Sequence, residues 1–355
     1  AAEHALALQS FDKMWTIVRD RHFDPKRNGA DWEAVKTEVR PKIEAATTHD
    51  QAVALMNEAL GRLGQSHFGI IPVDAYEGVT GGKDENDPTK KSTGEVGIDV
   101  RAIDGEAIVV AVDPGSPAEV AGIRPGWKIL EIDGKRVSKP LAAIDKAFAG
   151  EAKREGMLSH ALGNMVTGNL GEQMTFRVAD GDGTKKTLTL DVVETSGSAV
   201  VFGNLPAFHL EYDARTLPSG VAYLRFSVFF DPATLMPWFR ERVVSFAGAP
   251  GLIIDLRGNP GGIGGMAMGM GNMLVDRPNQ KLGTMTTRET SISFVLNPQV
   301  GRYAGPVAVL IDELSTSTSE ILAGGLQATG RAGVFGGGTP GMALPSQVGR
   351  LASGE

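Results

Sequence analysis

The chain has 355 residues, of which 42% are hydrophobic and 22% charged, with a formal net charge of −7 and no cysteine. This composition is typical of a globular protein long enough for two or three domains. The lack of cysteine excludes disulfides, thiolate metal sites and cysteine nucleophiles. An acidic balance without a basic block argues against nucleic acid as a partner, and no apolar run approaches the roughly 18 residues of a membrane span.

The N-terminal region, bounded at residues 1–80, predicts helices. Asp31 and Asp50 are expected to cap two of them, and the polar, breaker-rich segment at 81–88 predicts a linker that follows. Three segments carry apolar residues at spacings of three and four, the pattern of amphipathic helices: FDKMWTIVRDRHF, DWEAVKTEVRPKIEAA and HDQAVALMNEALGRL.

Two further regions follow along the chain. Residues 92–193 alternate short strands with glycine turns, and residues 153–173 within them predict a helical insert. From about residue 200 near-continuous apolar strands alternate with helices, one of them from Pro232 to Ala247. This pattern predicts an α/β core at residues 200–355 with its active site at the carboxyl ends of the strands.

Two strand-turn-helix units of the core carry candidate chemistry. In the second unit, a Ser/Thr run at 315–319 places a hydroxyl beside the N-terminus of a helix, where an anion would be stabilised. In the first, the glycines of residues 257–262 let the main chain aim an N–H at a developing oxyanion. The alternative for the Ser/Thr run is a set of ordinary helix caps, and the alternative for the glycine segment is a loop that merely ends a strand. The presence of both units favours one site built from the two.

Three segments together resemble the carboxy-terminal processing (tail-specific) serine proteases and their tricorn-like relatives: DLRGNPGG at 255–262, STSTSEILAGGLQATGR at 315–331, and a PDZ-like region at 92–193. The resemblance implies that Ser317 is the nucleophile and that the N–H groups of Gly261 and Thr318 hold the oxyanion. Relatives with a Ser–Lys dyad carry the lysine where this chain has Met342. A thioether cannot take a proton from serine, so we expect no dyad at that position.

The tricorn-like branch implies another base. Its Gly-x-Ser-His segment corresponds to the stretch ending in His67, which would act within a Ser–His–Glu arrangement. Imidazole suits this task because its ordinary pKa lies near neutrality. Glu320 is expected to be only a first-turn helix residue favoured by the helix dipole. Because the chain stops in the polar segment GRLASGE, we expect the orienting glutamate beyond Glu355 and a core that is C-terminally incomplete.

The PDZ resemblance implies a peptide-binding loop, in which Gly94, Val96 and Gly97 hold a terminal carboxylate and Ile98 lines a pocket. A PDZ domain that only packs against the core is an equal alternative. The predicted fold class is α/β, with an N-terminal helical region, a β-rich PDZ-like domain and a protease core.

The predicted function is a serine endopeptidase that forms an acyl-enzyme on protein or peptide substrates, guided by their C-termini, without a cofactor. An inactive, peptide-binding pseudoprotease is the alternative that Met342 favours and His67 opposes. A structural scaffold with no site would leave both turns unexplained. The small residues that open the chain, AAEHALALQSF, predict a periplasmic or secreted protein. The oligomeric state is left open.

Overall fold

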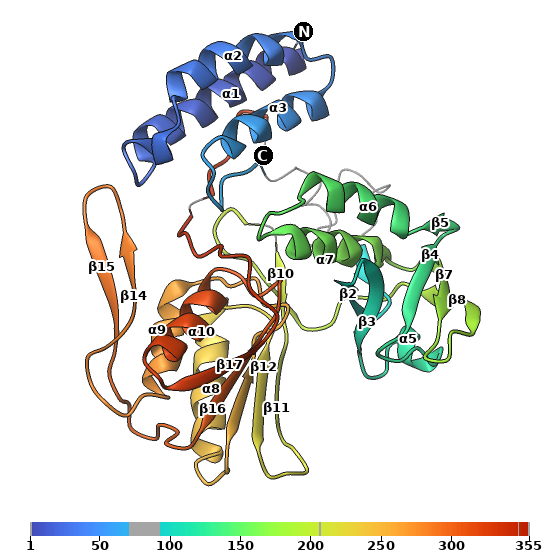
Figure 1. Ribbon diagram of the computed structural model, residues 1–355, viewed down its shortest axis with the longest axis vertical. Coiled ribbons are helices and arrows are strands. Elements are labelled where there is room, and N and C mark those ends of the chain that lie inside the picture. Colours follow the sequence, from blue (N-terminus) through green and yellow to red (C-terminus); the bar gives the residue numbers. More distant parts are fainter. Residues whose placement is uncertain (1, 71–92, 206, 347, 354–355) are drawn as a thin grey trace.

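A computed structural model describes residues 2–70, 93–205, 207–346 and 348–353. Their buried side chains gather in three clusters: one in the N-terminal helices, one in a β-rich middle region and one in the C-terminal α/β region (Figure 1). The predicted α/β fold class with these three parts is confirmed. The linker predicted at 81–88 lies outside the described residues. Within the described part of the chain, no helix combines the length and apolarity that a membrane crossing requires.

The N-terminal helices pack around a shared apolar core. Asp31 caps the second helix by accepting the N–H of Ala34 at 3.0 Å, as predicted. The expectation for Asp50 is wrong, because Thr48 caps the third helix by accepting the N–H of Gln51 at 3.2 Å. Asp50 therefore lies inside the first turn, where the helix dipole favours its charge. The helices are α1 (Ala2–Arg21), α2 (Trp32–Ala45) and α3 (His49–Gly61), with a 3-10 turn at Arg27–Gly29.

The middle region is an antiparallel sheet in the order β2-β3-β4-β7-β8, with β5 paired to β4. The predicted insert at 153–173 is helical only in part, because its later residues form β6, which pairs with β1. Helix α7 packs against the edge strand β2. The elements are β1 (Thr93–Glu95), β2 (Ile98–Ile103), β3 (Glu106–Val112), α5 (Pro117–Val120), β4 (Lys128–Ile132), β5 (Lys135–Arg136), α6 (Ser138–Ala147), α7 (Arg154–Met165), β6 (Thr167–Asn169), β7 (Gln173–Ala179) and β8 (Lys185–Asp191).

The core sheet has five strands in the order β11-β12-β13-β16-β17, of which the last four run parallel. Side chains of its helices and strands share one buried cluster. The elements are β9 (Ser198–Val200), β10 (Phe208–Leu210), β11 (Tyr212–Thr216), β12 (Ala222–Phe226), α8 (Pro232–Ser245), β13 (Leu252–Asp255), α9 (Gly264–Asn272), β14 (Gln280–Thr286), β15 (Ser291–Leu296), β16 (Val307–Ile311), α10 (Thr318–Ala328) and β17 (Ala332–Gly336).

The register of the sheet places the two candidate turns side by side. Strands β13 and β16 pair in parallel, with Asp255 opposite Leu310. Because parallel strands end at the same edge of a sheet, residues 257–262 and 315–319 leave it together. The expected position at the carboxyl ends of the strands is confirmed for both turns.

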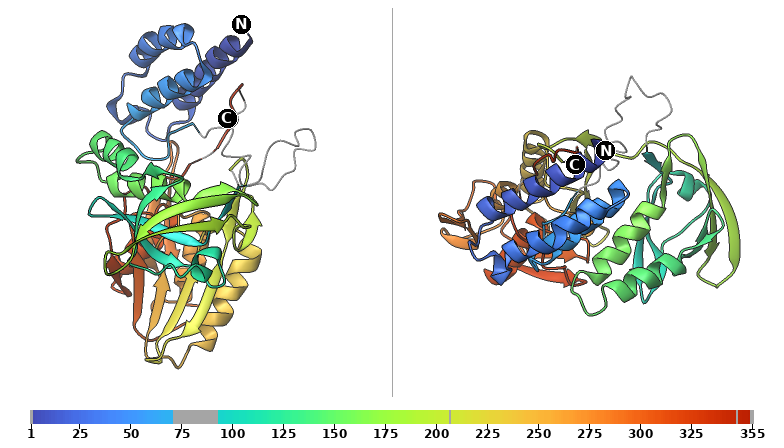
Figure 2. Two further views of the ribbon diagram at one scale, coloured as in Figure 1. Left: turned by 90° about the vertical axis from the view of Figure 1, so that its right-hand side faces the viewer. Right: turned by 90° about the horizontal axis from the view of Figure 1, so that it is seen from above.

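The helical domain lies above the core, and two segments reach across to it (Figures 1 and 2). At the tip of the β14–β15 hairpin, Arg288 donates to the carbonyls of Arg19 (3.2 Å) and Asp20, at the end of α1. Near the C-terminus, the N–H of Ser353 donates to the hydroxyl of Ser10 at 2.9 Å. These contacts tie the helical domain to the β14–β15 hairpin and to the C-terminal segment of the core.

Candidate active site

The Ser/Thr run fastens the second turn to the first. The four hydroxyls that flank Ser317, two on each side, donate to main-chain carbonyls of the neighbouring turn. These bonds join Ser315 to Leu256 (2.7 Å), Thr316 to Pro260 (2.9 Å), Thr318 to Gly262 (2.7 Å) and Ser319 to Asn259 (2.9 Å). Four hydroxyls are therefore structural, and the two turns form one unit.

Ser317 is the exception in this run. Its hydroxyl donates to no atom of the described residues, and its oxygen lies in a capping arrangement over the N–H of Glu320. The backbone of Ser317 has φ 55° and ψ −116°, an uncommon conformation for a residue with a side chain. A sharp strand-to-helix turn of this kind exposes the hydroxyl oxygen of a nucleophilic serine. Ser317 is thus chemically the freest hydroxyl of the five.

The glycine turn approaches Ser317 closely. Gly261 has φ 93°, and a Cβ built on it would lie 2.8 Å from both the Cβ of Ser317 and the N of Thr318. Only glycine fits there. The N–H of Gly261 donates to Oδ1 of Asn259 at 2.9 Å, so it has a different partner from the oxyanion that the sequence predicted. The N–H of Thr318 meets no acceptor among the described residues.

Asn259 is fully buried and organises this turn. Its Nδ2 donates to the carbonyl of Phe226 at 2.9 Å, and its Oδ1 accepts the hydroxyl of Ser319 at 3.1 Å in addition to the N–H of Gly261. In the sequence, Asn259 stands inside a glycine-rich motif, and no separate role was predicted for it. An asparagine between Arg-Gly and Pro-Gly-Gly was the available signal, because a buried amide must satisfy both donors and acceptors.

Asp255 lies below the turn and has a structural role. It is buried and accepts hydrogen bonds from Arg257 (Nε 2.9 Å, Nη2 2.6 Å) and from the hydroxyl of Tyr223 (2.7 Å). Burial acts to raise the pKa of Asp255, but the bonds from Arg257 and Tyr223 outweigh it and hold that pKa below its usual value. Burial and the bond to Asp255 raise the pKa of Tyr223 to about 12. This carboxylate is fully committed to its partners.

Met342 lies beside Ser317 but contacts the site through its main chain. Its carbonyl accepts the N–H of Ser317 at 3.1 Å, and its N–H donates to Oε2 of Glu320 at 2.9 Å. Glu320 also accepts the N–H groups of Ser317 and Gly341, both at 2.8 Å. The first-turn position expected for Glu320 is correct, and its carboxylate additionally holds the segment at 341–342 against the nucleophile turn.

His67 lies in the loop after α3, with φ 65° and with Nδ1 3.1 Å from the hydroxyl of Ser66. Its side chain is half-buried. Burial lowers the pKa of His67, and the charge of Glu320 opposes this by raising it. The imidazole therefore lies within electrostatic range of the residue that holds the Ser317 turn, although 253 positions separate His67 from Glu320 in the chain (320 − 67). It is mostly neutral at neutral pH, as a general base must be.

The predicted peptide-binding loop at 94–98 is engaged by its own chain. Glu95 exchanges both main-chain hydrogen bonds with Val193, each at 2.9 Å. Val96 is fully buried, its carbonyl accepts a main-chain N–H, and Ile98 packs against the core of its domain. The N–H groups of Val96 and Gly97, which would hold a carboxylate, donate to no acceptor among the described residues, so their peptide-binding role stays a prediction. Among the residues that the structure describes, no group of three or more His, Asp or Glu is arranged to hold a metal ion.

Comparisons with known proteins find three matching domains: the tricorn protease C1 domain at residues 4–61, a PDZ domain at 108–155 and peptidase family S41 at 220–355. Carboxyl-terminal-processing peptidase 3, chloroplastic, of Arabidopsis thaliana is 24% identical over 100% of this chain and 64% of its own length. Putative tricorn protease homolog 2 of Streptomyces coelicolor is 24% identical over 88% of this chain and 25% of its own. The chain thus spans less than two thirds of either relative.

Among solved structures, the photosystem II D1 C-terminal processing protease matches with a TM-score of 0.55 at 21% identity. The match covers 100% of this chain and 86% of that one, and it concerns the fold. The predicted resemblance to carboxy-terminal processing and tricorn-like proteases is confirmed.

Proposed function

We propose that this chain, a relative of the carboxy-terminal processing and tricorn-like proteases with an S41 peptidase domain, is a serine endopeptidase acting on protein or peptide substrates. One observation supports this most strongly. Of the five hydroxyls at 315–319, four are committed to carbonyls of the neighbouring turn and only that of Ser317 is left to react. A purely structural run would have no reason to hold its middle residue in a strained conformation.

In the proposed mechanism, neutral His67 takes the proton of Ser317 as Oγ attacks the peptide carbonyl, and the C–O bond forms. The protonated imidazole then gives this proton to the leaving amine as the C–N bond breaks, which leaves an acyl group on Ser317. Water, deprotonated by His67, then attacks the acyl carbon. As the ester C–O bond to Ser317 breaks, the imidazolium returns the proton to Oγ and the carboxylic acid product leaves. The choice of His67 over a lysine is supported by Met342, which occupies the position that the resemblance assigns to the dyad lysine and contacts the site through its main chain.

The oxyanion would be held by the N–H of Thr318, at the N-terminus of α10, together with an N–H of the glycine turn. Gly261 can supply that second donor only if Oδ1 of Asn259 releases it. Gly262 needs no such release. At φ 139° its N–H donates to no acceptor among the described residues, while its carbonyl accepts the hydroxyl of Thr318 at 2.7 Å.

The pseudoprotease reading has less support. It requires a peptide-binding PDZ domain, yet the loop at 94–98 is bonded to its own chain through Val193. A free hydroxyl facing a glycine turn also has no purpose in a binding module.

Labelling with a serine-reactive fluorophosphonate tests the proposal. We expect one labelled residue, Ser317, identified by peptide mapping, with casein hydrolysis lost in parallel. Thr316→Ala is the matched control, since it removes a neighbouring hydroxyl that is bonded to Pro260. Wild-type protein that binds peptides but neither takes the label nor hydrolyses casein would favour the pseudoprotease instead.

A further inference from the structure

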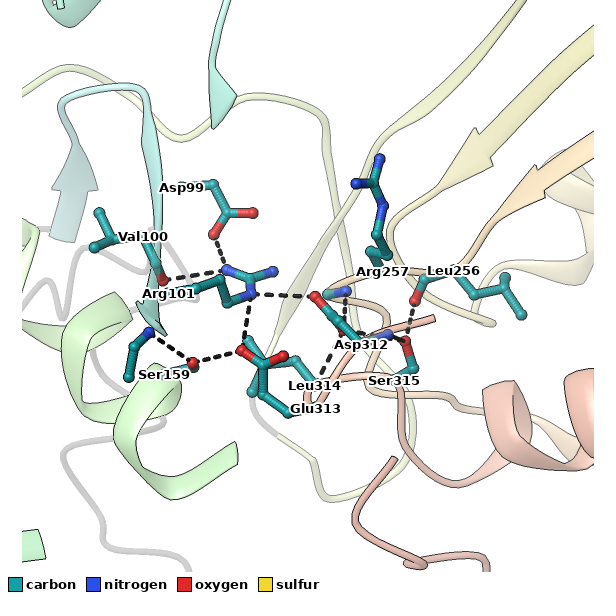
Figure 3. A network of polar contacts seen from close by, with 12 residues as sticks. Asp99, Val100, Arg101, Ser159, Leu256, Arg257, Asp312, Glu313, Leu314 and Ser315 are labelled. Carbon is teal, nitrogen blue, oxygen red and sulfur yellow. Dashed lines mark hydrogen bonds and ion pairs between the residues drawn. The ribbon is translucent and has the colours of Figure 1, made fainter. Parts of the chain in front are cut away.

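Arg101, on strand β2 of the PDZ domain, reaches into the core (Figure 3). Only 7% of its surface is exposed. Its Nε lies 3.1 Å from Oδ2 of Asp312 and 3.6 Å from Oε1 of Glu313, both of which follow β16, and Nη1 contacts Asp99. Burial opposes the charge, but the carboxylates of Asp99 and Asp312 outweigh it and raise the pKa of Arg101. The guanidinium is therefore a permanent charge between two domains.

Asp312 connects this guanidinium to both turns of the candidate active site. Its Oδ1 accepts the N–H of Gly258 at 2.8 Å, and Gly258 belongs to the glycine turn. The same oxygen accepts the N–H of Leu314 and the hydroxyl of Ser315, both at 3.1 Å, on the nucleophile turn. Arg101 also packs on the glycine turn directly, because a Cβ on Gly258, where φ is 74°, would lie 2.9 Å from its Nη2.

The outer edge of β2 is occupied by the same network. The hydroxyl of Ser159, on α7, accepts the N–H of Ala102 at 3.2 Å and donates to Oε1 of Glu313 at 2.6 Å. The carbonyl of Val100 accepts a hydrogen bond from Arg101 at 3.3 Å. A peptide adding as a strand would need these main-chain groups. Here they are bonded to Ser159 and Arg101 of the same domain, whose side chains in turn contact Glu313 and Asp312 of the core, which favours a PDZ domain that packs against the core.

We propose that Arg101 is a positioning residue for the peptidase reaction: through Asp312 it holds the glycine turn and the nucleophile turn in their relative geometry. This rests on the proposed function. The physical reason is charge balance. Asp99, Asp312 and Glu313 converge on one guanidinium, and without it the carboxylate of Asp312, whose side chain is only 13% exposed, would face like charges. Asp312 would then turn away and release Gly258 and Ser315.

The experiment compares Arg101→Met, Arg101→Lys and Asp312→Asn, measuring the rate of fluorophosphonate labelling at Ser317, kcat and KM on a peptide, and thermal unfolding. Arg101→Met should lower the labelling rate and kcat on the order of 10²-fold with KM little changed, because a small misplacement of reacting groups costs about that much. Arg101→Lys should recover part of the loss. The double variant Arg101→Met/Asp312→Asn should be no slower than the worse single variant, since both act through one contact.

Arg136→Met is the matched control: it makes the same change in the PDZ domain at a side chain that is 79% exposed, and it should label like wild type. If Arg101→Met protein is folded and labels as fast as wild type, the positioning role is overturned. Amide hydrogen exchange at Gly258 and Leu314 separates this failure from failure of the proposed function. If Ser317 of the wild-type protein is never labelled, faster amide exchange at Gly258 and Leu314 in Arg101→Met would still support the positioning role of Arg101. Unchanged exchange at these two residues would refute it.

Discussion

The nucleophile turn and the loop of His67 are built in opposite ways. Ser317 lies in a turn whose neighbouring hydroxyls bond to the adjacent turn, within one sheet. His67 lies on a different domain, where its Nδ1 is 3.1 Å from the hydroxyl of Ser66, and the charge of Glu320 in the core raises its pKa. The proposed nucleophile is positioned by local contacts, whereas the proposed base belongs to a separate domain.

This difference predicts where the site can fail. The helical domain is held by exposed contacts such as that of Arg288 with the end of α1, each worth on the order of 1 kcal/mol. The contacts around Asn259 are buried, so losing one leaves an unsatisfied polar group at greater cost. Small movements of the domain should therefore alter the base before they alter the nucleophile.

The largest effect is expected for Ser317→Ala, which removes the nucleophile. Peptidase activity should fall about 10⁶-fold, the scale seen when a serine protease loses its serine. Ser315→Ala is the contrasting variant, because it removes a buried structural hydroxyl bonded to Leu256. It should lower the free energy of unfolding by about 1–3 kcal/mol while Ser317 still takes the label. Loss of labelling in Ser315→Ala at a temperature where it is folded, with Ser317→Ala still active, would reverse the assignment.

His67→Ala should lower kcat by about 10²–10⁴-fold, the usual contribution of a general base. The fold and the conformation of the Ser317 turn should persist, because His67 is on another domain. His49→Ala, which changes an exposed histidine of the same domain, is the control and should retain activity. Full activity in His67→Ala would show that another group removes the proton.

Glu320→Gln should move the acid limb of the pH–rate profile for kcat/KM to lower pH. Glu320 raises the pKa of His67 by its charge, so removing the charge lowers that pKa and keeps the imidazole neutral in more acidic solution. Glu241→Gln on α8 is the matched control and should leave the limb in place. A limb that shifts to higher pH would contradict the assignment of His67.

The same pKa has a consequence for stability. Because burial lowers the pKa of His67 in the folded state, the unfolded chain binds the proton more readily. The contribution of His67 to stability is therefore present above the ordinary histidine pKa of about 6.5 and is lost as the pH falls through the folded value. In His67→Gln the free energy of unfolding, measured from about pH 6.5 downward, should no longer lose this contribution.

The smallest effect is expected for Met342→Ala. The main-chain bonds of Met342 to Ser317 and Glu320 survive this substitution, so kcat/KM should stay within about tenfold of wild type. Met342→Pro removes the N–H that Glu320 accepts and should be clearly worse. A loss in Met342→Ala as large as that in His67→Ala would show that the thioether itself matters.

Several features could be predicted from the sequence because their causes are local. Apolar periodicity predicts the helices of the N-terminal domain, including the one that begins at Trp32, and the parallel strands of the core. Because turn residues follow two of these strands, the sequence also predicts that the two turns lie together at the carboxyl ends of the strands. The cap at Asp31 follows from side-chain chemistry next to a helix start. The cap at Thr48 was missed because Thr48 and Asp50, two positions apart, both have side chains that can cap a helix, and only the backbone geometry chooses between them.

What the sequence determined by itself is the set of reactive groups and the backbone conformations they allow: the strands, the glycine turn and the hydroxyl run that contains Ser317. Only the tertiary structure decided which of these groups are already in use. Asn259 takes the N–H of Gly261 inside one turn, while Arg101 reaches Asp312 across 211 positions of the chain. A pattern in the sequence shows that a donor exists. Whether it is free depends on which acceptors the fold brings within about 3 Å.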